Sequence, residues 1–415
     1  MKKIEHIIKK ANYCEPGKVT PCVLGCPLNN NIPKFIDYIK KEKYKKAYEI
    51  LSETTVLSPL CGRICPHDNQ CQGACIKKRD GKPVKIGDLE KFIGDLSLKE
   101  DWRVTSPKKT KYHVAVVGAG PAGLTCAAFL RRNGIGVTIY EKYDYLGGLL
   151  VHGIPDFRLL KKLVKEVTDR IVDFGIDVKY NMELGKDISL NYLKRKYDAI
   201  FLGIGANISN KMNIPGEGKD GVYGANELLE NNMELDLKNK IVVVFGGGNV
   251  AMDACRTIKR KGAKKVIVIY RREEDDMTAE DKEIRAAKKD GIKFLYLTKI
   301  LKVMGHKKVE RIEVIKTKTV KKNGEDKLIN LKGSNYTINC DYVIRAIGSK
   351  QDEELVNSFG LEIDKNGKVD IDRFGHTSNK KIFAGGDLAG VKGTVAWAAR
   401  SGRNAAYEIM DYLQK

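Results

Sequence analysis

Seven of the ten cysteines lie within the first 75 residues, and this is where the sequence most clearly points to chemistry. Four of them fall in the stretch CGRICPHDNQCQGAC at residues 61–75, and the other three are Cys14, Cys22 and Cys26. Thiols at this density form disulfides, bind zinc or hold iron–sulfur clusters. The N-terminus does not have the pattern of a secretory signal, so we expect a reducing cytoplasm, where clustered thiols bind metal more often than they form disulfides.

Two glycine-rich turns indicate a second chemistry, the binding of nucleotides. The first, GxGxxG, directly follows the apolar run VAVV at residues 114–117. Its glycines permit a tight turn, close approach of the backbone to a pyrophosphate, and close packing of helix on strand. The helix N-terminus favours that anion, and an acid ending the next strand can accept hydrogen bonds from ribose. The residues predicted to contact this nucleotide are Gly118, Gly120, Pro121, Ala122, Gly123 and Glu141.

The second turn has the form GxGxxA and follows the strand-like run IVVVF. The next predicted strand ends at Tyr270, and two arginines stand where the first unit has its acid. Guanidinium groups suit a 2′-phosphate, so we expect NADPH in preference to NADH. The alternative is that both arginines merely cap a surface strand. The residues predicted to contact this nucleotide are Gly246, Gly248, Asn249, Val250, Ala251, Arg271 and Arg272.

The segment KIFAGGDLAGVKGTVAWAARSGRNAAYEI, residues 381–409, resembles the one that holds the FAD ribityl chain in flavoproteins with two dinucleotide-binding domains. That architecture implies that the first turn binds FAD and that the NADPH domain is inserted into the FAD domain. We expect hydride transfer from NADPH to FAD without a catalytic side chain, because the cofactors carry the reaction. The further residues predicted to contact FAD are Gly148, Leu149, Gly386, Asp387 and Thr394.

Electrons leaving a reduced flavin need an acceptor, and the remaining cysteines do not supply one. Cys126, Cys255 and Cys340 are single and lie in apolar segments, so we interpret them as core residues. No C-x₂-C pair or histidine-rich run indicates structural zinc. Thiolate-ligated iron–sulfur clusters in the N-terminal segment are therefore the expected exit.

Motifs along the chain occur in the order typical of one family. They read PCVLGCPLNNNIPKFIDYI, CGRICPHDNQCQGAC, PVKIGDLEKFIGD, GGLLVHGIPDFRL, GGGNVAMDACRT and YRREEDDMTAEDKEI. The chain resembles the glutamate synthase (NADPH) small-chain family over essentially its full length. The same architecture occurs in the N-terminal part of dihydropyrimidine dehydrogenase and in the large subunit of NADH-dependent ferredoxin:NADP transhydrogenase.

The resemblance implies two sets of cluster ligands. One [4Fe–4S] cluster would be held by three thiolates and a carboxylate, from Cys26, Cys65, Cys71 and Glu90. The other would use Cys14, Cys22 and Cys75, but Gly17 stands where the family has a further thiolate. The second site is thus left with several outcomes: a three-iron cluster, a four-iron cluster completed by water, Cys61 or a partner's ligand, or no cluster.

The alternation of strand, glycine turn and helix predicts an α/β fold with two Rossmann-like dinucleotide-binding domains. A helical iron–sulfur domain precedes them, since residues from Ile32 onward have helical periodicity. The expected domains are residues 1–105 for iron–sulfur, 106–206 and 346–415 for FAD, and 207–345 for NAD(P)H.

The expected function is that of an electron-transferring subunit. It would oxidise NADPH and pass electrons through FAD and a cluster to a larger catalytic or electron-accepting subunit, with ferredoxin as another acceptor, in a hetero-oligomer. Glutamate synthase is the first expectation, and a dihydropyrimidine dehydrogenase or bifurcating transhydrogenase subunit is the alternative. A rival of another class is a non-catalytic assembly protein whose electron path has decayed at Gly17.

The formal net charge of +22 permits two interpretations. One is a basic surface that attracts an acidic protein, and the other is lysine spread over solvated helices. Nucleic acid is not expected as a partner, because the basic residues are not interleaved with stacking aromatic side chains. A membrane is not expected either, because no run approaches the roughly 18 apolar residues of a spanning segment.

Overall fold

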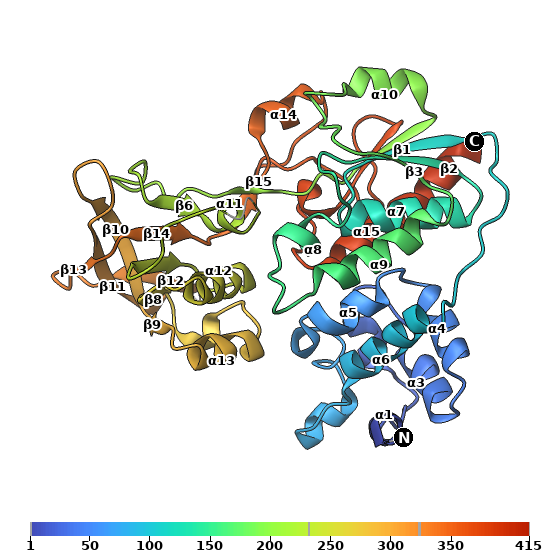
Figure 1. Ribbon diagram of the computed structural model, residues 1–415, viewed down its shortest axis with the longest axis horizontal. Coiled ribbons are helices and arrows are strands. Elements are labelled where there is room, and N and C mark those ends of the chain that lie inside the picture. Colours follow the sequence, from blue (N-terminus) through green and yellow to red (C-terminus); the bar gives the residue numbers. More distant parts are fainter. Residues whose placement is uncertain (1, 231–232, 323–324, 415) are drawn as a thin grey trace. The chain divides into compact units, whose positions relative to one another are not determined.

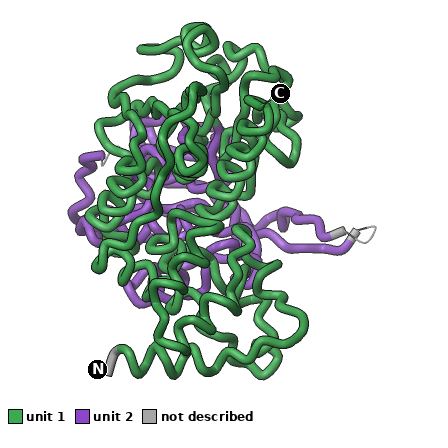
Figure 2. Tube along the Cα trace, turned by 90° about the vertical axis from the view of Figure 1, so that its right-hand side faces the viewer, with its two compact units in different colours: residues 1–151, 156–206, 351–415 green, residues 152–155, 207–350 purple. Residues whose placement is uncertain are grey.

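The computed structural model describes residues 2–230, 233–322 and 325–414, which form two compact units (Figure 2). Unit 1 comprises residues 1–151, 156–206 and 351–415, and unit 2 comprises residues 152–155 and 207–350. Unit 2 is thus inserted in the chain of unit 1. The finer division into domains at residues 105, 206 and 345 stays a prediction.

The first part of unit 1 is a bundle of short helices, which we call the head (residues 2–99, blue in Figure 1). In α3 the Asn31 side chain accepts a hydrogen bond from Lys34 N at 3.4 Å and so caps the helix. The helical periodicity predicted from Ile32 is confirmed, and its apolar positions are buried. The helices of the head are α1 (Lys2–Asn12), α2 (Pro21–Gly25), α3 (Ile32–Lys40), α4 (Tyr44–Ser52), α5 (Ser58–Ile64), η1 (His67–Asn69), η2 (Ile76–Asp80) and α6 (Ile86–Lys99).

The rest of unit 1 is built on a parallel sheet of order β16-β4-β1-β2-β3. Strands β16, β4, β1 and β2 are mostly apolar and buried because helices cover both faces, whereas β3 at the edge is partly exposed. On one face pack α10 (Leu190–Lys196) and α14 (Glu353–Ser358). The strands are β1 (His113–Val117), β2 (Gly136–Tyr140), β3 (Asp177–Lys179), β4 (Ala199–Leu202) and β16 (Ile382–Ala384), and the opposite face carries α7 (Pro121–Arg132), α9 (Lys161–Val172) and α15 (Val395–Gln414) (Figure 1).

Helices α7 and α15 pack so closely that glycine is required between them. A Cβ at Gly402 of α15 would lie 2.0 Å from the carbonyl oxygen of Ala122 in α7. Two short elements complete this half of the unit: α8 (Leu149–His152), which follows β2, and η4 (Gly386–Ala389), which follows β16.

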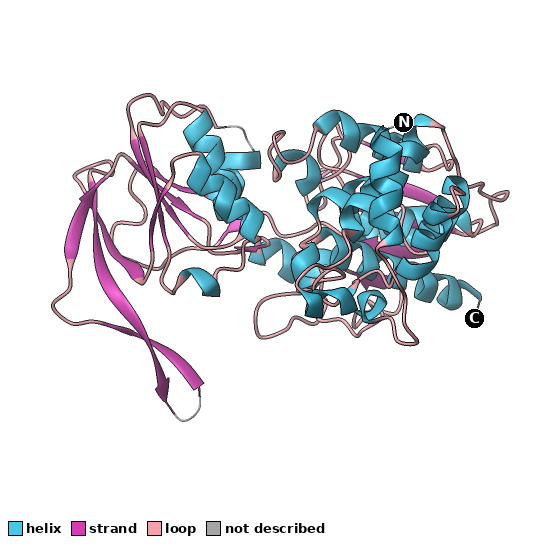
Figure 3. Ribbon diagram, turned by 90° about the horizontal axis from the view of Figure 1, so that it is seen from below, coloured by secondary structure: helices cyan, strands magenta, loops and turns pink. Residues whose placement is uncertain are grey.

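Unit 2 contains a second parallel sheet, of order β6-β14-β7-β8-β9, and an antiparallel sheet beside it. The antiparallel sheet was not predicted, and its long hairpin of β11 and β12 is visible in Figure 3. The parallel strands are β6 (Val222–Gly224), β7 (Ile241–Phe245), β8 (Lys265–Ile269), β9 (Lys293–Leu295) and β14 (Tyr342–Arg345). The helices are α11 (Ala225–Glu230), α12 (Asn249–Arg260), η3 (Glu274–Asp276) and α13 (Asp281–Lys289). The antiparallel strands are β10 (Thr298–Met304), β11 (Arg311–Lys322), β12 (Glu325–Asn330) and β13 (Tyr336–Asn339), and β5 (Ile208–Ser209) pairs with β15 (Ser349–Lys350).

Across residues 2–230, 233–322 and 325–414, none of the helices has both the length and the apolar character needed to cross a lipid bilayer.

The contact between α7 and α15 predicts the effect of a single methyl group. Gly402→Ala should lower the free energy of unfolding by about 3 kcal/mol, because backbone atoms of α7 cannot make room for it. A control is Gly393→Ala, where an added Cβ meets nothing within 4 Å, and it should change stability by less than about 0.5 kcal/mol. Urea denaturation measures both, and equal losses in the two variants would show that the close packing is not as described.

Candidate functional site

The first glycine turn brings backbone very close to backbone in unit 1. Gly118 has φ +94°, and a Cβ there would lie 2.6 Å from the carbonyl oxygen of Gly203. A Cβ at Gly123 would lie 1.9 Å from the carbonyl oxygen of Gly118. Gly120, in contrast, precedes α7 and faces open space, with nothing within 4 Å of a Cβ position. The turn therefore leaves room for an anion at the N-terminus of α7, as a pyrophosphate requires.

Glu141 is fixed at the edge of this turn. Its carboxylate is 4% exposed and accepts hydrogen bonds from Ala119 N at 2.7 Å and from Tyr143 N at 3.1 Å. The start of α8 joins the same place, since a Cβ at Gly148 would lie 3.0 Å from Gly120 Cα. The first turn, Glu141 and the start of α8 thus lie close together.

The closing segment of the chain reaches the same helix. A Cβ at Gly386 would lie 3.3 Å from the Ala122 side chain, so η4 sits beside the start of α7. Burial raises the pKa of the next residue, Asp387, while the charge of Lys368 opposes this shift. Thr394 precedes α15, and its hydroxyl accepts a hydrogen bond from Trp397 N at 3.3 Å. The contacts of these residues with FAD remain predictions, and the arrangement fits that cofactor.

The second glycine turn has the same construction in unit 2. Gly246 has φ +150°, and a Cβ there would lie 2.1 Å from the carbonyl oxygen of Ala346. Gly248 precedes α12, and Asn249 Oδ1 accepts a hydrogen bond from Glu280 N at 3.0 Å. Ala251 is completely buried, as expected for the position where helix packs on strand.

The two arginines predicted to select a phosphorylated ribose follow strand β8. Arg271 and Arg272 are both exposed. The carbonyl oxygen of Arg271 accepts a hydrogen bond from the Thr317 hydroxyl at 2.6 Å, which attaches this loop to β11. Val250, in the first turn of α12, is 41% exposed. The side chains of both arginines are therefore accessible to an anionic ligand.

Four of the predicted iron ligands lie together in the interior of the head. Cys26 and Cys65 end α2 and α5, Cys71 follows η1, and Glu90 lies in α6. All four are at most 7% exposed. They are close enough for their charges to act on one another, because a negative charge on Glu90 raises the pKa of all three thiols.

Burial makes ionisation of this group unfavourable in the absence of cations. Burial is the main cause that raises the pKa of Cys26 to about 12 and the pKa of Glu90 to about 8. A hydrogen bond with Cys61 is the first cause of the raised pKa of Cys65, followed by burial. Iron ions supply the positive charge that would keep the thiolates and the carboxylate ionised.

Glu90 is oriented by a chain of hydrogen bonds that was not predicted. Asn30 Nδ2 donates to Glu90 Oε1 at 3.4 Å, and the Thr54 hydroxyl donates to Asn30 Oδ1 at 2.6 Å. The Thr54 carbonyl oxygen in turn accepts from Arg403 Nη1 of α15 at 2.7 Å. Carboxylate ligands of metals are commonly held by such hydrogen bonds. Asn30 lies within the motif PCVLGCPLNNNIPKFIDYI, but that pattern did not indicate which asparagine contacts Glu90.

The other three predicted thiol ligands form a second group, the outer thiols, in which Cys14 and Cys22 are partly exposed and Cys75 is buried. Burial is the first cause that raises the pKa of Cys22 to about 11, and the charges of Cys14 and Cys75 add to it. Gly17 is exposed in the loop between Cys14 and Cys22. Cys61 is 1% exposed and lies beside Cys65, so it belongs to the interior group.

Among the described residues, no three or more His, Cys, Asp or Glu side chains are arranged around the position of a single metal ion. A [4Fe–4S] cluster is larger than one ion and takes its ligands at separate corners. Its usual donors are thiolates, and the interior group offers three of them with one carboxylate. The interior group therefore fits a four-iron cluster by its donor chemistry. Its identity as the ligand set stays a prediction.

The head and the predicted flavin site are in direct contact within unit 1. Gln70 Nε2 lies 3.5 Å from Thr394 Oγ1, which joins the residue before Cys71 to the start of α15. Arg400 Nη1 donates to the carbonyl oxygen of Pro27 at 3.1 Å, and Arg403 Nη1 donates to that of Leu28 at 2.9 Å. Helix α15 thus holds the two residues that directly follow Cys26.

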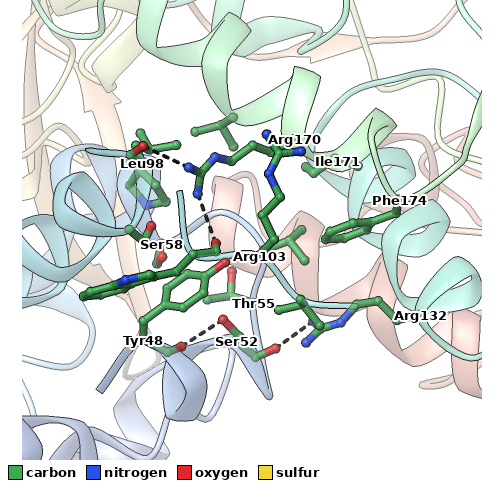
Figure 4. A pocket seen from close by; sticks show the side chains of 16 residues that line it. Tyr48, Ser52, Thr55, Ser58, Leu98, Arg103, Arg132, Arg170, Ile171 and Phe174 are labelled. Carbon is green, nitrogen blue, oxygen red and sulfur yellow. Dashed lines mark hydrogen bonds between the residues drawn. The ribbon is translucent and has the colours of Figure 1, made fainter. Parts of the chain in front are cut away.

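A cavity lies at the border between the head and the sheet of unit 1, and its side chains hold these two parts together (Figure 4). It contains about 490 Å³ of empty space, part of it open to solvent. Three arginines line it, but their guanidinium groups are already engaged. Arg132 donates to Ser52 O at 2.8 Å, Arg170 donates to Leu98 O at 2.9 Å, and Arg103 pairs with Asp173 at 2.6 Å. We therefore assign these arginines to holding the head, not to binding an anion.

The raised pKa of Glu90 predicts how pH acts on metal-free protein. Its pKa rises from 4.5 to about 8 on folding, so the folded state favours the protonated acid. The contribution of Glu90 to the free energy of unfolding should therefore be fully present below pH 4.5 and should fall by up to about 5 kcal/mol as pH rises from 4.5 through about 8. Urea denaturation under reducing, chelating conditions measures this fall. Glu90→Gln should remove most of it, and an identical pH profile in that variant would refute the assignment.

Comparison with known proteins agrees with this geometry. Residues 112–402 match the family described as pyridine nucleotide-disulphide oxidoreductase, and residues 1–102 match dihydropyrimidine dehydrogenase domain II, 4Fe-4S cluster. A likeness in fold extends to FprA from Mycobacterium tuberculosis in complex with NADPH, with a TM-score of 0.65 and 19% identity over 74% of this chain and 85% of that chain. The predicted α/β fold class is confirmed, and FAD, NAD(P)H and a [4Fe–4S] cluster agree with these families.

Three relatives match almost the whole chain. The glutamate synthase [NADPH] small chain of Escherichia coli is 34% identical over 95% of this chain and 88% of its own length. AegA of Escherichia coli is 36% identical over 98% of this chain, but the chain spans only 65% of that protein. The NADP(+)-dependent formate dehydrogenase subunit beta of Moorella thermoacetica is 32% identical, and the chain spans 61% of it. The chain belongs to the glutamate synthase [NADPH] small-chain family, and within it residues 112–402 belong to the pyridine nucleotide-disulphide oxidoreductases.

Proposed function

We propose that this protein oxidises NADPH and delivers the electrons through its iron–sulfur head to a larger partner subunit, as the small chain of a glutamate synthase. The observation that carries the proposal is the contact between Gln70 and Thr394. It joins the loop of the interior thiol group to the predicted flavin site within one compact unit. Electrons could therefore leave a flavin bound there by way of the head.

Each part of the chain has a defined role in this function. The turn at Gly118–Gly123 would bind the FAD pyrophosphate, and Glu141 would orient the ribose. Bound FAD accepts two electrons from the nicotinamide, and a cluster takes electrons singly. The head excludes water from the interior group, since Cys26, Cys65, Cys71 and Glu90 are at most 7% exposed. No side chain acts as nucleophile or base in this scheme.

The exposed surface around α2 supports the proposal that the protein binds a partner subunit. Val19 and Leu24 are 68% and 81% exposed, and α2, which carries Leu24, has no buried residue. Lys18 and Lys77 lie in the segments that also carry the outer thiols. An exposed apolar surface with a basic border fits a protein partner that presents apolar and acidic groups. The outer thiols lie where an electron would pass to such a partner.

The function is tested by an anaerobic titration of purified protein with NADPH. Flavin absorbance should bleach, and the reduced protein should then pass single electrons to a one-electron dye. Glu90→Ala should retain flavin bleaching and lose dye reduction, because only the cluster path is altered. A colourless, folded protein would instead favour the assembly role, and loss of bleaching in Glu90→Ala would refute the order of the path.

The preference for NADPH is predicted to depend on the arginines after β8. Replacing both, Arg271→Ala with Arg272→Ala, should raise KM for NADPH by about tenfold or more, because charge-assisted hydrogen bonds to the 2′-phosphate are lost. KM for NADH should change less than about twofold, since NADH lacks that phosphate. Arg285→Ala, an exposed arginine of α13, is the matched control. Equal effects on both nucleotides would mean that the pair only caps the strand.

Partner binding is predicted to depend on the exposed face of α2. Leu24→Glu should weaken binding of a purified glutamate synthase large chain by about tenfold or more, because a charge replaces an apolar contact. Iron content and flavin reduction should stay unchanged. Leu160→Glu, at a leucine that is 64% exposed elsewhere in unit 1, should bind like the unaltered protein. Calorimetry measures both, and similar affinity in the two variants would place the interface elsewhere.

A further inference from the structure

The outer thiol group offers three cysteine ligands from three separate segments. Cys14 follows α1, Cys22 lies in α2, and Cys75 precedes η2. These segments lie side by side, because Lys77 pairs with Glu15 at 2.5 Å and Ile76 Cδ1 lies 4.0 Å from the Cβ position of Gly17. The charges of Cys14 and Cys75 also act on Cys22, which agrees with this placement. A four-iron cluster has four corners, so three protein thiolates leave one iron without a sulfur ligand from this group.

Gly17 lies beside this group, and neither backbone nor packing requires glycine there. A Cβ at this position would meet only Val19 O at 3.8 Å and Ile76 Cδ1 at 4.0 Å, which are ordinary contacts. The backbone of Gly17 does not have a positive φ, so its conformation is open to other residues. Ile76 directly follows Cys75, so Gly17 is an exposed position without a side chain near a predicted cluster ligand, and we call this position the opening.

Two neighbouring side chains that could act as the ligand of the fourth iron already interact with other residues. Cys61 is 1% exposed and is hydrogen-bonded to Cys65 in the interior group. Glu15 pairs with Lys77 at 2.5 Å. Lys40 donates to the carbonyl oxygen of Cys14, so a second ammonium group lies near the thiols. The surroundings of the opening are therefore basic and suit an anionic ligand.

We propose that Cys14, Cys22 and Cys75 hold a [4Fe–4S] cluster whose fourth iron faces the opening at Gly17 and binds a small thiolate from solution. This rests on the part of the proposed function that assigns iron–sulfur clusters to the head. The step is a ligand exchange in which a thiolate replaces iron-bound water, which leaves as a free molecule, and no electron is transferred. Thiolate is preferred because it is a soft ligand for iron–sulfur clusters.

The experiment compares three forms of the full chain, reconstituted anaerobically with iron and sulfide: unaltered protein, Gly17→Cys and Gly17→Ala. Each is titrated with 2-mercaptoethanol while circular dichroism in the visible range and electron paramagnetic resonance of the clusters are recorded. Unaltered protein and Gly17→Ala should show a saturable spectral change. Gly17→Cys should show less than about a tenth of it, because its own thiolate occupies the fourth iron, with equal iron per chain in all three.

Each outcome decides the proposal. No spectral change in unaltered protein, an equal change in Gly17→Cys, or iron for only one cluster per chain would overturn it. A three-iron cluster that takes up no further iron would overturn it as well. The proposed function would be refuted independently of this proposal if NADPH did not bleach the flavin but 2-mercaptoethanol still changed the cluster spectrum.

Discussion

The burial of three thiols and one carboxyl group in a single space constrains the whole head. Cys26, Cys65, Cys71 and Glu90 would each carry a negative charge as iron ligands, yet burial raises the pKa of every one of them. The charge of Glu90 raises the pKa of the three thiols further. A buried group of this kind is stable as neutral acids or as anions around a cation. The predicted cluster would supply that cation.

The position of this group is determined by α15, a helix that also begins at the predicted flavin site. Arg403 is 8% exposed and donates to the carbonyl oxygens of Leu28 and Thr54. Burial lowers the pKa of Arg403, which means that burial disfavours its charge. The hydrogen bonds to carbonyl oxygens compensate for this cost. From Thr54 the hydrogen bonds continue through Asn30 to Glu90. One connected network therefore links the helix at the predicted flavin site with Glu90, the predicted oxygen ligand.

Much of the fold and of the candidate site could be predicted from the sequence because glycine and cysteine patterns carry their own geometry. Gly118 and Gly246 were recognisable since only glycine fits the close backbone contacts of these turns. The contact of Arg403 could not be predicted, because its partners are backbone carbonyl oxygens, which every residue possesses. Strands β10 to β13 were missed because lysines alternate irregularly with apolar residues there, as in KTKTVKK. Their pairing depends on long-range register, which local patterns do not reveal.

The most direct test of the account is the metal content of anaerobically isolated protein, measured with its FAD content and with paramagnetic resonance after addition of NADPH. The account predicts FAD together with at least about four iron and four sulfide per chain, and a reduced-cluster signal that appears with NADPH. A folded protein that contains FAD and no iron would contradict it, because the interior acid group would then have another purpose.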